Sequence, residues 1–383
     1  MSDFEFQTVP RILMEQGAAR SLGPFLKNTF SAHTAVIVTD KGVIQAGLLE
    51  GALGSLRKAG VEAQVIDDVI ADPPEHMVLA LAEKVKGAGD VIIGFGGGSS
   101  MDTAKLLAVL AKGEQDLASM YGIDQISSAR MPMVMIPTTA GTGSEVTPIS
   151  IVTTGETTKA GIVSPVLYAD VAILDPELTL SLPPHVTAAT GIDAMVHAIE
   201  AFTSKHKKNP LSDTLAMKAL RLLSQAVPNA YRDGSDVKAR SDALLGSMLA
   251  GQAFANAPVA AVHALAYPLG GIYHLPHGLS NALVLPYVIE FNRKYAVDHY
   301  AALYTHVTGD ENGSPDARSC RFAEYIIDLC ETVGMRQKLR DLNISHNRLP
   351  ELAEDAMKQT RLLGNNPRDV TYEDALRIYE QAW

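Results

Sequence analysis

Cysteine and tryptophan are scarce in this sequence, which contains two Cys and one Trp among 383 residues. Two cysteines are too few for the disulfide framework of a small secreted domain or for a thiolate metal site. Cys320 and Cys330 both fall in the stretch 319–333, which has helical spacing of apolar residues, so we expect two buried, unreactive thiols. The first ten residues carry acidic side chains and lack the apolar core of a signal peptide, which favours a cytoplasmic protein.

Positive charge is also in short supply. Lys and Arg number 32 against 43 Asp and Glu, which gives a formal net charge of −11. A chain this acidic is a poor candidate for binding nucleic acid or an anionic membrane. Long apolar runs are lacking as well, because the most apolar stretch, residues 248–271, is interrupted by Asn256, Pro258, His263 and Pro268. That stretch predicts a buried, Ala-rich helix and no membrane span.

The first half of the chain alternates strand-like and helix-like patterns. Apolar or β-branched runs at 35–39, 63–66, 91–95 and 133–136 are separated by stretches that include amphipathic patterns at 48–59 and 75–88. This alternation predicts a parallel sheet, which binds ligands at the carboxyl ends of its strands. After Pro183 and Pro184 nearly every pattern is helical. The sequence therefore predicts an α/β domain over residues 1–184 and an all-α domain over residues 185–383.

Three consecutive glycines follow the strand expected at 91–95. Gly96, Gly97 and Gly98 lead with Ser99 into a helix that we expect to begin near Met101. Backbone amides at such a turn, together with the positive end of a helix, suit a phosphate group. The G-x-G-x-x-G fingerprint and the Walker motif are both missing. A tight turn between strand and helix is the alternative, but the pattern favours phosphate binding.

Two further segments complete a candidate nucleotide site. Asp40 ends the first clear strand, where a carboxylate can accept hydrogen bonds from both ribose hydroxyls and repels a 2′-phosphate. It therefore favours NAD over NADP, although an N-cap or turn aspartate is the alternative. Residues 137–145, PTTAGTGSE, add hydroxyl groups and glycines behind another strand.

A carboxylate and several imidazoles point to a metal. Asp193 and His197 are four residues apart, which places both on one face of a helix. A buried carboxylate needs a cation or a donor. His263, His274 and His277 follow in otherwise apolar sequence, and one Asp with imidazoles suits Fe²⁺ or Zn²⁺ better than Ca²⁺ or Mg²⁺. Spacing leaves open which of His274 and His277 is the last ligand, and core or capping histidines are the alternative.

Five segments together resemble the iron-containing (group III) alcohol dehydrogenase family. They are GGGSSMDTAK at 96–105, PTTAGTGSEVT at 137–147, TAATGIDAMVHAIEAF at 187–202, HALAYPLGG…HLPHGLSNALVLP at 263–286 and GNNPRDVTYEDALRIYEQAW at 364–383. Lactaldehyde reductases and small-diol dehydrogenases are the members that the chain resembles most. The resemblance spans essentially the whole chain and implies a dehydroquinate synthase-like fold, with a dinucleotide-binding domain followed by a helical metal-binding domain. It also implies NAD and Fe²⁺, or Zn²⁺ or another divalent transition metal, as cofactors of an oxidoreductase. Such an enzyme transfers a hydride between NAD(H) and a short primary alcohol or aldehyde, including hydroxyaldehydes, diols and hydroxy acids.

The resemblance also implies individual residues. The metal ligands are Asp193, His197, His263 and His277, so His277 is preferred over His274. The implied nucleotide contacts are Asp40, Gly97, Gly98, Ser99, Thr138, Thr139, Thr142 and Lys159, beside Gly96 in the glycine-rich turn. Phe254 matches an aromatic residue of the substrate pocket, and the family suggests a homodimer or a higher homo-oligomer.

Two positions depart from the family pattern. Tyr267 stands four residues after His263, where many members carry a histidine that is often proposed to relay protons. A phenol, with a reference pKa of about 10, relays protons only if a metal or a nearby charge lowers that pKa, and otherwise Tyr267 shapes the pocket. Asp72 stands where the family usually has Asn before Pro. A carboxylate beside a phosphate is unfavourable unless it faces away or pairs with a cation, so the role of Asp72 stays open.

Two alternatives remain at this point. Dehydroquinate synthase and glycerol-1-phosphate dehydrogenase relatives share the two-domain plan, but their phosphorylated substrates demand a cluster of Lys and Arg, and none lies between His263 and His277. A non-catalytic NAD-binding scaffold is the other alternative, which four intact ligands disfavour.

Overall fold

The computed structural model of the protein describes residues 3–155, 158–335 and 337–383. The chain forms two compact units, one of Thr8–Ser181 and one of Leu182–Trp383 together with Met1–Gln7. The division falls slightly before the boundary expected at residue 184. The N-terminal segment, expected in the α/β domain, groups with the helical unit, where the Gln7 N–H donates to Asn256 Oδ1 and Asn256 Nδ2 donates to the Gln7 carbonyl, both at 2.8 Å.

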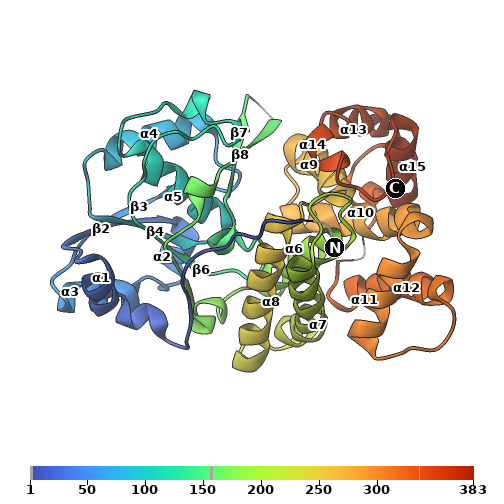
Figure 1. Ribbon diagram of the computed structural model, residues 1–383, viewed down its shortest axis with the longest axis horizontal. Helices are drawn as coiled ribbons and strands as arrows, with labels where there is room; N and C mark the ends of the chain where they lie inside the picture. Colours follow the sequence, from blue (N-terminus) through green and yellow to red (C-terminus); the bar gives the residue numbers. More distant parts are fainter. Residues whose placement is uncertain (1–2, 156–157, 336) are drawn as a thin grey trace. The chain divides into compact units, whose positions relative to one another are not determined.

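A six-stranded sheet forms the centre of the unit Thr8–Ser181 (Figure 1). Its strands are β1 (Ile12–Met14), β2 (Thr34–Asp40), β3 (Glu62–Val69), β4 (Val91–Gly96), β6 (Met133–Pro137) and β9 (Val171–Leu174). Their order is β1-β9-β6-β4-β2-β3, and all neighbours are parallel. Every residue of β4 and β6 is buried, as expected for parallel strands covered on both faces. The predicted parallel sheet is confirmed.

Helices cover both faces of this sheet. They are α1 (Leu22–Phe30), α2 (Lys41–Gln45), α3 (Glu50–Lys58), α4 (Glu75–Val85) and α5 (Gly98–Leu110). Leu26 of α1 and Leu56 of α3 pack with Ile37 and Ile93 in one core cluster, and α4 and α5 lie on the opposite side (Figure 1). Helix α5 begins at Gly98, three residues before the expected start near Met101. Gly98 and Ser99 therefore belong to its first turn, where backbone N–H groups have no intrahelical partner.

A small second sheet was not expected from the sequence. It contains β5 (Gly122–Ile123), β7 (Ile149–Thr154) and β8 (Thr158–Val163) in the order β5-β8-β7. Strands β7 and β8 are antiparallel, with Thr153 opposite Lys159. The backbone N–H of Thr153 also donates to the Pro73 carbonyl at 2.9 Å, which ties β7 to the segment after β3.

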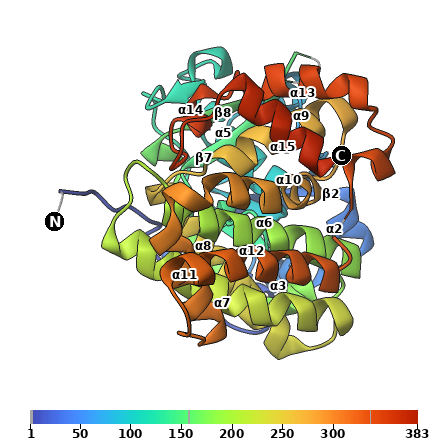
Figure 2. The same cartoon turned by 90° about the vertical axis from the view of Figure 1, so that its right-hand side faces the viewer.

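The other unit is helical, as predicted. Its helices are α6 (Pro184–Thr203), α7 (Pro210–Arg232), α8 (Val237–Asn256), α9 (Ala261–Tyr273), α10 (His277–Asn292), α11 (Val297–Thr308), α12 (Pro315–Thr332), α13 (Leu349–Ala356), α14 (Thr360–Leu363) and α15 (Tyr372–Ala382). Helices α6, α7 and α8 pack against one another (Figure 2). Among the described residues, no helix is both long and apolar enough to cross a membrane.

Two expectations for this unit were wrong. The stretch 248–271 is not one helix: α8 ends at Asn256 and α9 begins at Ala261, since Pro258 lacks an N–H and the intervening residues leave the helical conformation. Cys330 is buried, but Cys320 is exposed. At 3.6 residues per turn, Cys320 points about 100° away from the buried Ser319 and so lies outside the apolar stripe of α12.

Candidate functional site

Helix α6 presents three polar side chains on one buried face. Asp193, His197 and Glu200 occupy positions i, i+4 and i+7, and each residue is at most 5% exposed. Asp193 and His197 were predicted to face inward together. Glu200 was missed, although its spacing of seven residues from Asp193 places it on the same face.

Three histidines converge on the Asp193 carboxylate. Oδ1 of Asp193 lies 3.4 Å from Nε2 of His277, 3.7 Å from Nε2 of His263 and 3.9 Å from Nε2 of His197. Ligand atoms of Asp193, His263 and His277 all lie within 4.8 Å of one another. His197 stands beside this trio, with its ring stacked on that of His263 at a centroid distance of 4.8 Å.

Glu200 orients His263. Its Oε2 contacts Nδ1 of His263 at 2.6 Å, and because a carboxylate only accepts, Nδ1 carries the proton. The same carboxylate accepts the backbone N–H groups of Ala260 and Val262, at 3.0 and 2.6 Å, and so satisfies the first turn of α9. Nε2 of His263 is left directed at Asp193.

Helix α10 supplies the remaining imidazole. A Cβ at Gly278 would lie 1.9 Å from the Ala189 carbonyl oxygen of α6, so only glycine permits this approach of α10 to α6. Asn281, one turn later, donates from Nδ2 to Asp193 Oδ1 at 2.6 Å. His274 ends α9 with a left-handed backbone (φ 54°) and is exposed, so the structure brings His277 and not His274 to Asp193.

The convergence of these side chains shifts the pKa values of Asp193 and His263. Burial alone would raise the pKa of Asp193, but the imidazoles of His197, His277 and His263 and the Asn281 amide together hold it below its usual value. Burial lowers the pKa of His263, whereas the hydrogen bond and charge of Glu200 raise it above its usual value.

These residues fit a divalent transition metal. Nε2 of His263 is fully buried and has no hydrogen-bond partner among the described residues. A tetrahedral ion with bonds of about 2.1 Å places its ligand atoms roughly 3.4 Å apart, close to the separations of the three Nε2 atoms from Asp193 Oδ1. A donor set of one carboxylate oxygen and imidazole nitrogens matches Fe²⁺ or Zn²⁺.

Two aromatic residues line the imidazoles. Phe254 stacks on His197 with ring centroids 4.3 Å apart. Tyr267 lies one helical turn after His263, with its ring centroid 6.1 Å from that of His277. The His277 side chain is 32% exposed whereas Asp193 and His263 are almost fully buried, so the imidazole cluster is reached from the side of His277 and Tyr267.

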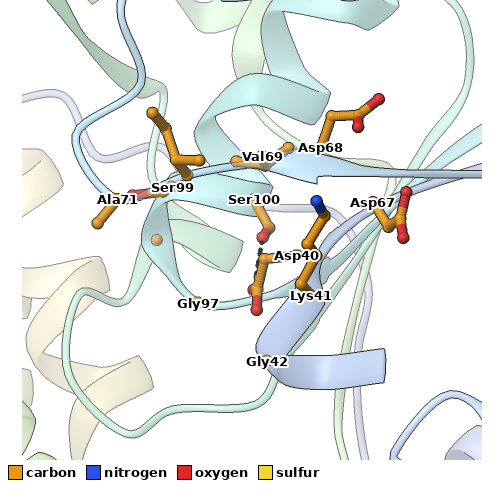
Figure 3. A pocket seen from close by; sticks show the side chains of 12 residues that line it. Asp40, Lys41, Gly42, Asp67, Asp68, Val69, Ala71, Gly97, Ser99 and Ser100 are labelled. Atoms are coloured by element: carbon orange, nitrogen blue, oxygen red, sulfur yellow. Dashed lines mark hydrogen bonds between the residues drawn. The ribbon is translucent and has the colours of Figure 1, made fainter. Parts of the chain in front are cut away.

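A separate cavity lies at the carboxyl ends of β2, β3 and β4 (Figure 3). It has a volume of about 520 Å³ and is lined by Asp40, Lys41, Gly42, Asp67, Asp68, Val69, Ile70, Ala71, Gly97, Gly98, Ser99 and Ser100. Asp40 caps α2 by accepting the Val43 N–H at 3.0 Å and also accepts the Ser100 hydroxyl at 3.1 Å. Asp40 is therefore both an N-cap, which was the alternative considered from the sequence, and one of the residues that line the cavity.

The glycine-rich turn at 96–99 packs against residues 137–145, which we call the threonine-rich loop. A Cβ at Gly98 would lie 2.7 Å from Cγ2 of Thr142, and one at Gly97 would lie 3.6 Å from Oγ1 of Thr139. The Thr138 N–H donates to the Gly96 carbonyl at 2.9 Å. Among the described residues, the N-cap of α5, Gly97, provides no side-chain capping hydrogen bond, so amides of the first turn can face an anion beside these hydroxyl groups.

Comparisons with known proteins give one consistent result. The family model "Iron-containing alcohol dehydrogenase" matches residues 10–176, and "Fe-containing alcohol dehydrogenase family, C-terminal" matches residues 187–383. Long-chain-alcohol dehydrogenase 1 of Geobacillus thermodenitrificans is 42% identical over 372 residues, covering 96% of this chain and 93% of that protein. The chain belongs to the iron-containing alcohol dehydrogenase family.

Solved structures agree with this assignment. The crystal structure of a 1,3-propanediol oxidoreductase matches with a TM-score of 0.95 and 34% identity, covering all of both chains. The sulfoacetaldehyde reductase of Bifidobacterium kashiwanohense, solved in complex with NAD⁺, matches with a TM-score of 0.89 and 29% identity over 100% of this chain and 99% of that one. This iron-containing alcohol dehydrogenase is therefore an oxidoreductase with the two-domain fold expected from its sequence.

A buried lysine of this alcohol dehydrogenase was not predicted to matter. Lys105 of α5 is fully buried, and its Nζ donates to Ser144 Oγ at 2.7 Å, Thr147 Oγ1 at 3.2 Å and the Ile149 carbonyl at 2.7 Å. Burial lowers the pKa of Lys105, against the opposing charge of Asp102. The lysine thereby fastens the helix behind the glycine-rich turn to residues 144–149, at the end of the loop 137–145 and just after it.

Lys159 and Asp72, the two positions that the sequence left with least explanation, lie together. Lys159 Nζ donates to Asp72 Oδ1 at 2.5 Å. Neither residue lines the cavity, but Ala71 does, one residue before Asp72. The carboxylate at position 72 therefore pairs with a cation.

Proposed function

We propose that this protein catalyses reversible hydride transfer between NAD(H) and a short primary alcohol or aldehyde, with a bound divalent metal. The convergence of three Nε2 atoms on one oxygen of Asp193 carries the proposal, because it is a ready set of ligands for a transition ion. We assign Asp193, His197, His263 and His277 as the ligands and Fe²⁺ as the metal expected from the family.

The ion, when bound, supplies a Lewis acid that polarises a substrate oxygen and favours the developing alkoxide. The protein residues have separate tasks. Glu200 keeps the proton of His263 on Nδ1, so that Nε2 is free to coordinate. Asn281 fixes the Asp193 carboxylate through a hydrogen bond of 2.6 Å.

NAD is the dinucleotide that the cavity favours. Asp40, Asp67 and Asp68 are lining residues, against Lys41 as the one cation among them. Lys84 pairs with the Asp68 carboxylate at 2.6 Å, so Asp40 and Asp67 carry the unpaired negative charge of this lining set. Such a wall repels the 2′-phosphate of NADP and suits the hydroxyl groups of an NAD ribose. Gly96, Gly97, Gly98, Ser99, Thr138, Thr139 and Thr142, with the N-terminus of α5, are assigned to the pyrophosphate side of the nucleotide.

Tyr267 and Phe254 are assigned to the substrate side of the metal. Phe254 contributes an apolar ring beside His197, and Tyr267 contributes a phenol beside the more exposed ligand His277. We assign Tyr267 as the proton relay or pocket wall in place of the usual histidine. The relatives named for propanediol and sulfoacetaldehyde support small hydroxylated or charged aldehydes as the first substrates to test.

The remaining assignments rest on the family. We propose a cytoplasmic enzyme that works as a homodimer or a larger homo-oligomer. A dehydroquinate synthase-like activity has less support, because the sequence places no Lys or Arg between His263 and His277.

The decisive test is NADH oxidation by protein purified without oxygen and reconstituted with Fe²⁺. The assay panel contains short aldehydes, hydroxyaldehydes, semialdehydes and sulfoacetaldehyde, with a long-chain aldehyde for comparison, each with and without a chelator. We expect turnover of one short class that the chelator abolishes. Full turnover by metal-free protein, or no turnover despite stoichiometric metal and bound NADH, would overturn the proposal, and the second result would favour an NAD-binding scaffold.

Two matched variants test the ligand assignment. His277→Asn removes an imidazole that faces Asp193, whereas His274→Asn makes the same change at an exposed position whose left-handed backbone tolerates Asn. We expect loss of bound metal and of activity in the first variant and wild-type metal content in the second. Equal metal retention by both variants would contradict the assignment of His277.

A further inference from the structure

An ion pair crosses between two segments at the edge of the nucleotide cavity. Asp72 lies in the segment after β3, and Lys159 lies on β8, 87 residues later. The Lys159 side chain is only 7% exposed, whereas that of Asp72 is 49% exposed. The cation is therefore enclosed, and its carboxylate partner faces solvent.

Thr153 on β7 holds the backbone of the Asp72 segment beside the strand that carries Lys159. Its N–H donates to the Pro73 carbonyl at 2.9 Å, and its hydroxyl donates to the Asp72 carbonyl at 3.0 Å. Thr153 is also the residue that faces Lys159 across the β7–β8 hairpin. Asp72 adopts a left-handed conformation (φ 51°) that Asp and Asn tolerate better than other side-chain-bearing residues. The pair is therefore built into the backbone and is not a chance meeting of two long surface side chains.

This pairing bears on the pyrophosphate of a bound dinucleotide. Ala71 lines the cavity together with Gly97 and Gly98 at the start of α5, and Asp72 follows Ala71 directly. Lys159 does not itself line the cavity, but Asp72 holds its ammonium group next to the lining residue Ala71, so a phosphate bound on that side would share this single charge with Asp72. A lysine already held by a carboxylate neutralises a phosphate less well than one held by a neutral amide.

We propose that Asp72 is a positioning residue that competes for Lys159 and thereby weakens the binding of NAD(H). The inference rests on the proposed function, specifically on a dinucleotide in this cavity. Asp72 holds the ammonium group in place in the free protein and keeps the affinity for the dinucleotide below the value that Lys159 alone would give. Faster release of the dinucleotide is the functional gain, since release limits turnover in many enzymes.

The test is a double-mutant cycle read out by NADH binding to metal-free protein, so that it does not depend on turnover. Asp72→Asn removes the charge, keeps the shape and tolerates the left-handed backbone. Asp124→Asn is the matched control, because Asp124 is an exposed aspartate of the same unit with φ 54°. Lys159→Met removes the cation, and the double variant closes the cycle.

We expect Asp72→Asn to lower the Kd for NADH three- to tenfold and to slow NADH release in a displacement experiment by a similar factor. The gain should shrink as salt rises from 50 to 300 mM, because salt screens the exposed carboxylate. Asp124→Asn should leave Kd unchanged. In the Lys159→Met background, Asp72→Asn should change Kd by less than 1.5-fold, because the carboxylate acts through the lysine.

Two results would overturn the inference. One is an unchanged or raised Kd in Asp72→Asn, and the other is a gain of equal size without Lys159, which would assign the effect to direct repulsion of the nucleotide. Wild-type protein that binds no NADH at all would instead refute the proposed nucleotide site. Thermal unfolding of each variant without NADH identifies any loss of affinity that comes from damage to the fold.

Discussion

Glu200 makes three hydrogen bonds at the start of α9, two to backbone N–H groups and one to His263. A single side chain of α6 thus accepts two backbone N–H groups at the start of α9 and selects the tautomer of one proposed ligand. The pairing of a metal-bound histidine with a carboxylate through its other ring nitrogen is a common way to fix ligand orientation and raise basicity. The proposed metal site therefore depends on Glu200, which is not one of the assigned ligands.

Glu200→Gln should weaken metal binding by roughly 10- to 100-fold, because a neutral amide holds the Nδ1–H of His263 less firmly. Chelator competition measures the metal affinity, and thermal unfolding of metal-free protein reports the separate cost of a poorer cap for α9. Glu324→Gln is the control, since Glu324 is exposed on α12 of the same unit. Wild-type metal affinity in Glu200→Gln would show that Glu200 only stabilises the helix.

The group of side chains assigned to the metal could be predicted from the sequence only in part. The spacing of Asp193 and His197 predicts their common helix face, and the apolar surroundings predict burial. The choice between His274 and His277 depends on where α9 ends, because one residue closes that helix and the other begins α10. In the structure that end is marked by the left-handed backbone of His274, whose N–H donates to the Leu269 carbonyl, and periodicity does not reveal such a residue.

Helix α5 owes its position to a buried polar network. Asp102 accepts the Ser144 hydroxyl at 2.5 Å and the Ile151 N–H at 3.0 Å, and Lys105 binds three oxygens of the same segment. Glu145 is also buried there, and burial raises its pKa to about 7. The helix after the glycine-rich turn and residues 144–151 are thus joined by the fully buried Lys105 and the mostly buried Asp102.

The raised pKa of Glu145 predicts a pH-dependent stability. Below pH 4.5 the carboxyl is protonated in both the folded and the unfolded states, and the folded state keeps its proton up to about pH 7. Stability is therefore lost between about pH 4.5 and 7, where the carboxyl ionises in the unfolded chain but keeps its proton in the folded one, by about 3 kcal/mol at 1.36 kcal/mol per unit. Glu145→Gln should lack this loss, so that its melting temperature relative to wild type rises from about pH 4.5 to pH 7 and then levels off.

The control is Glu114→Gln, an exposed position of the same unit. Its melting temperature should follow that of wild type across the whole pH range. A difference between Glu145→Gln and wild type that stays constant from pH 5 to pH 8 would mean that Glu145 does not titrate in that interval.

Elements with strong periodicity or continuous apolar runs could be predicted, and those that depend on distant partners could not. Strands β2, β4 and β6 are buried on both faces and read as apolar runs. The hairpin β7–β8 gave no such signal, because residues of both its strands are only partly buried. The ion pair of Lys159 with Asp72 was equally hidden, since it joins that hairpin to a loop 87 residues away.

The two proposed cofactors engage different parts of the chain. All four assigned metal ligands belong to the unit Leu182–Trp383, whereas every residue assigned to the nucleotide belongs to Thr8–Ser181. A ligand that binds only the folded state stabilises it by about 2.7 kcal/mol at a concentration of 100 times its Kd. Each cofactor should therefore leave its own pattern of protection on the backbone.

Hydrogen exchange read by mass spectrometry checks this expectation. Removal of metal should speed amide exchange in peptides from α6, α9 and the start of α10, because the uncompensated Asp193 and its imidazoles lose the cation that joins three helices. NADH should slow exchange in peptides that contain the end of β2 and the first turn of α5. Peptides from α12, which carries no assigned ligand, are the internal reference. If chelation loosened the β2 and α5 peptides and left α6 and α9 unchanged, the metal would have to lie elsewhere than on Asp193, and the ligand assignment would fall with it.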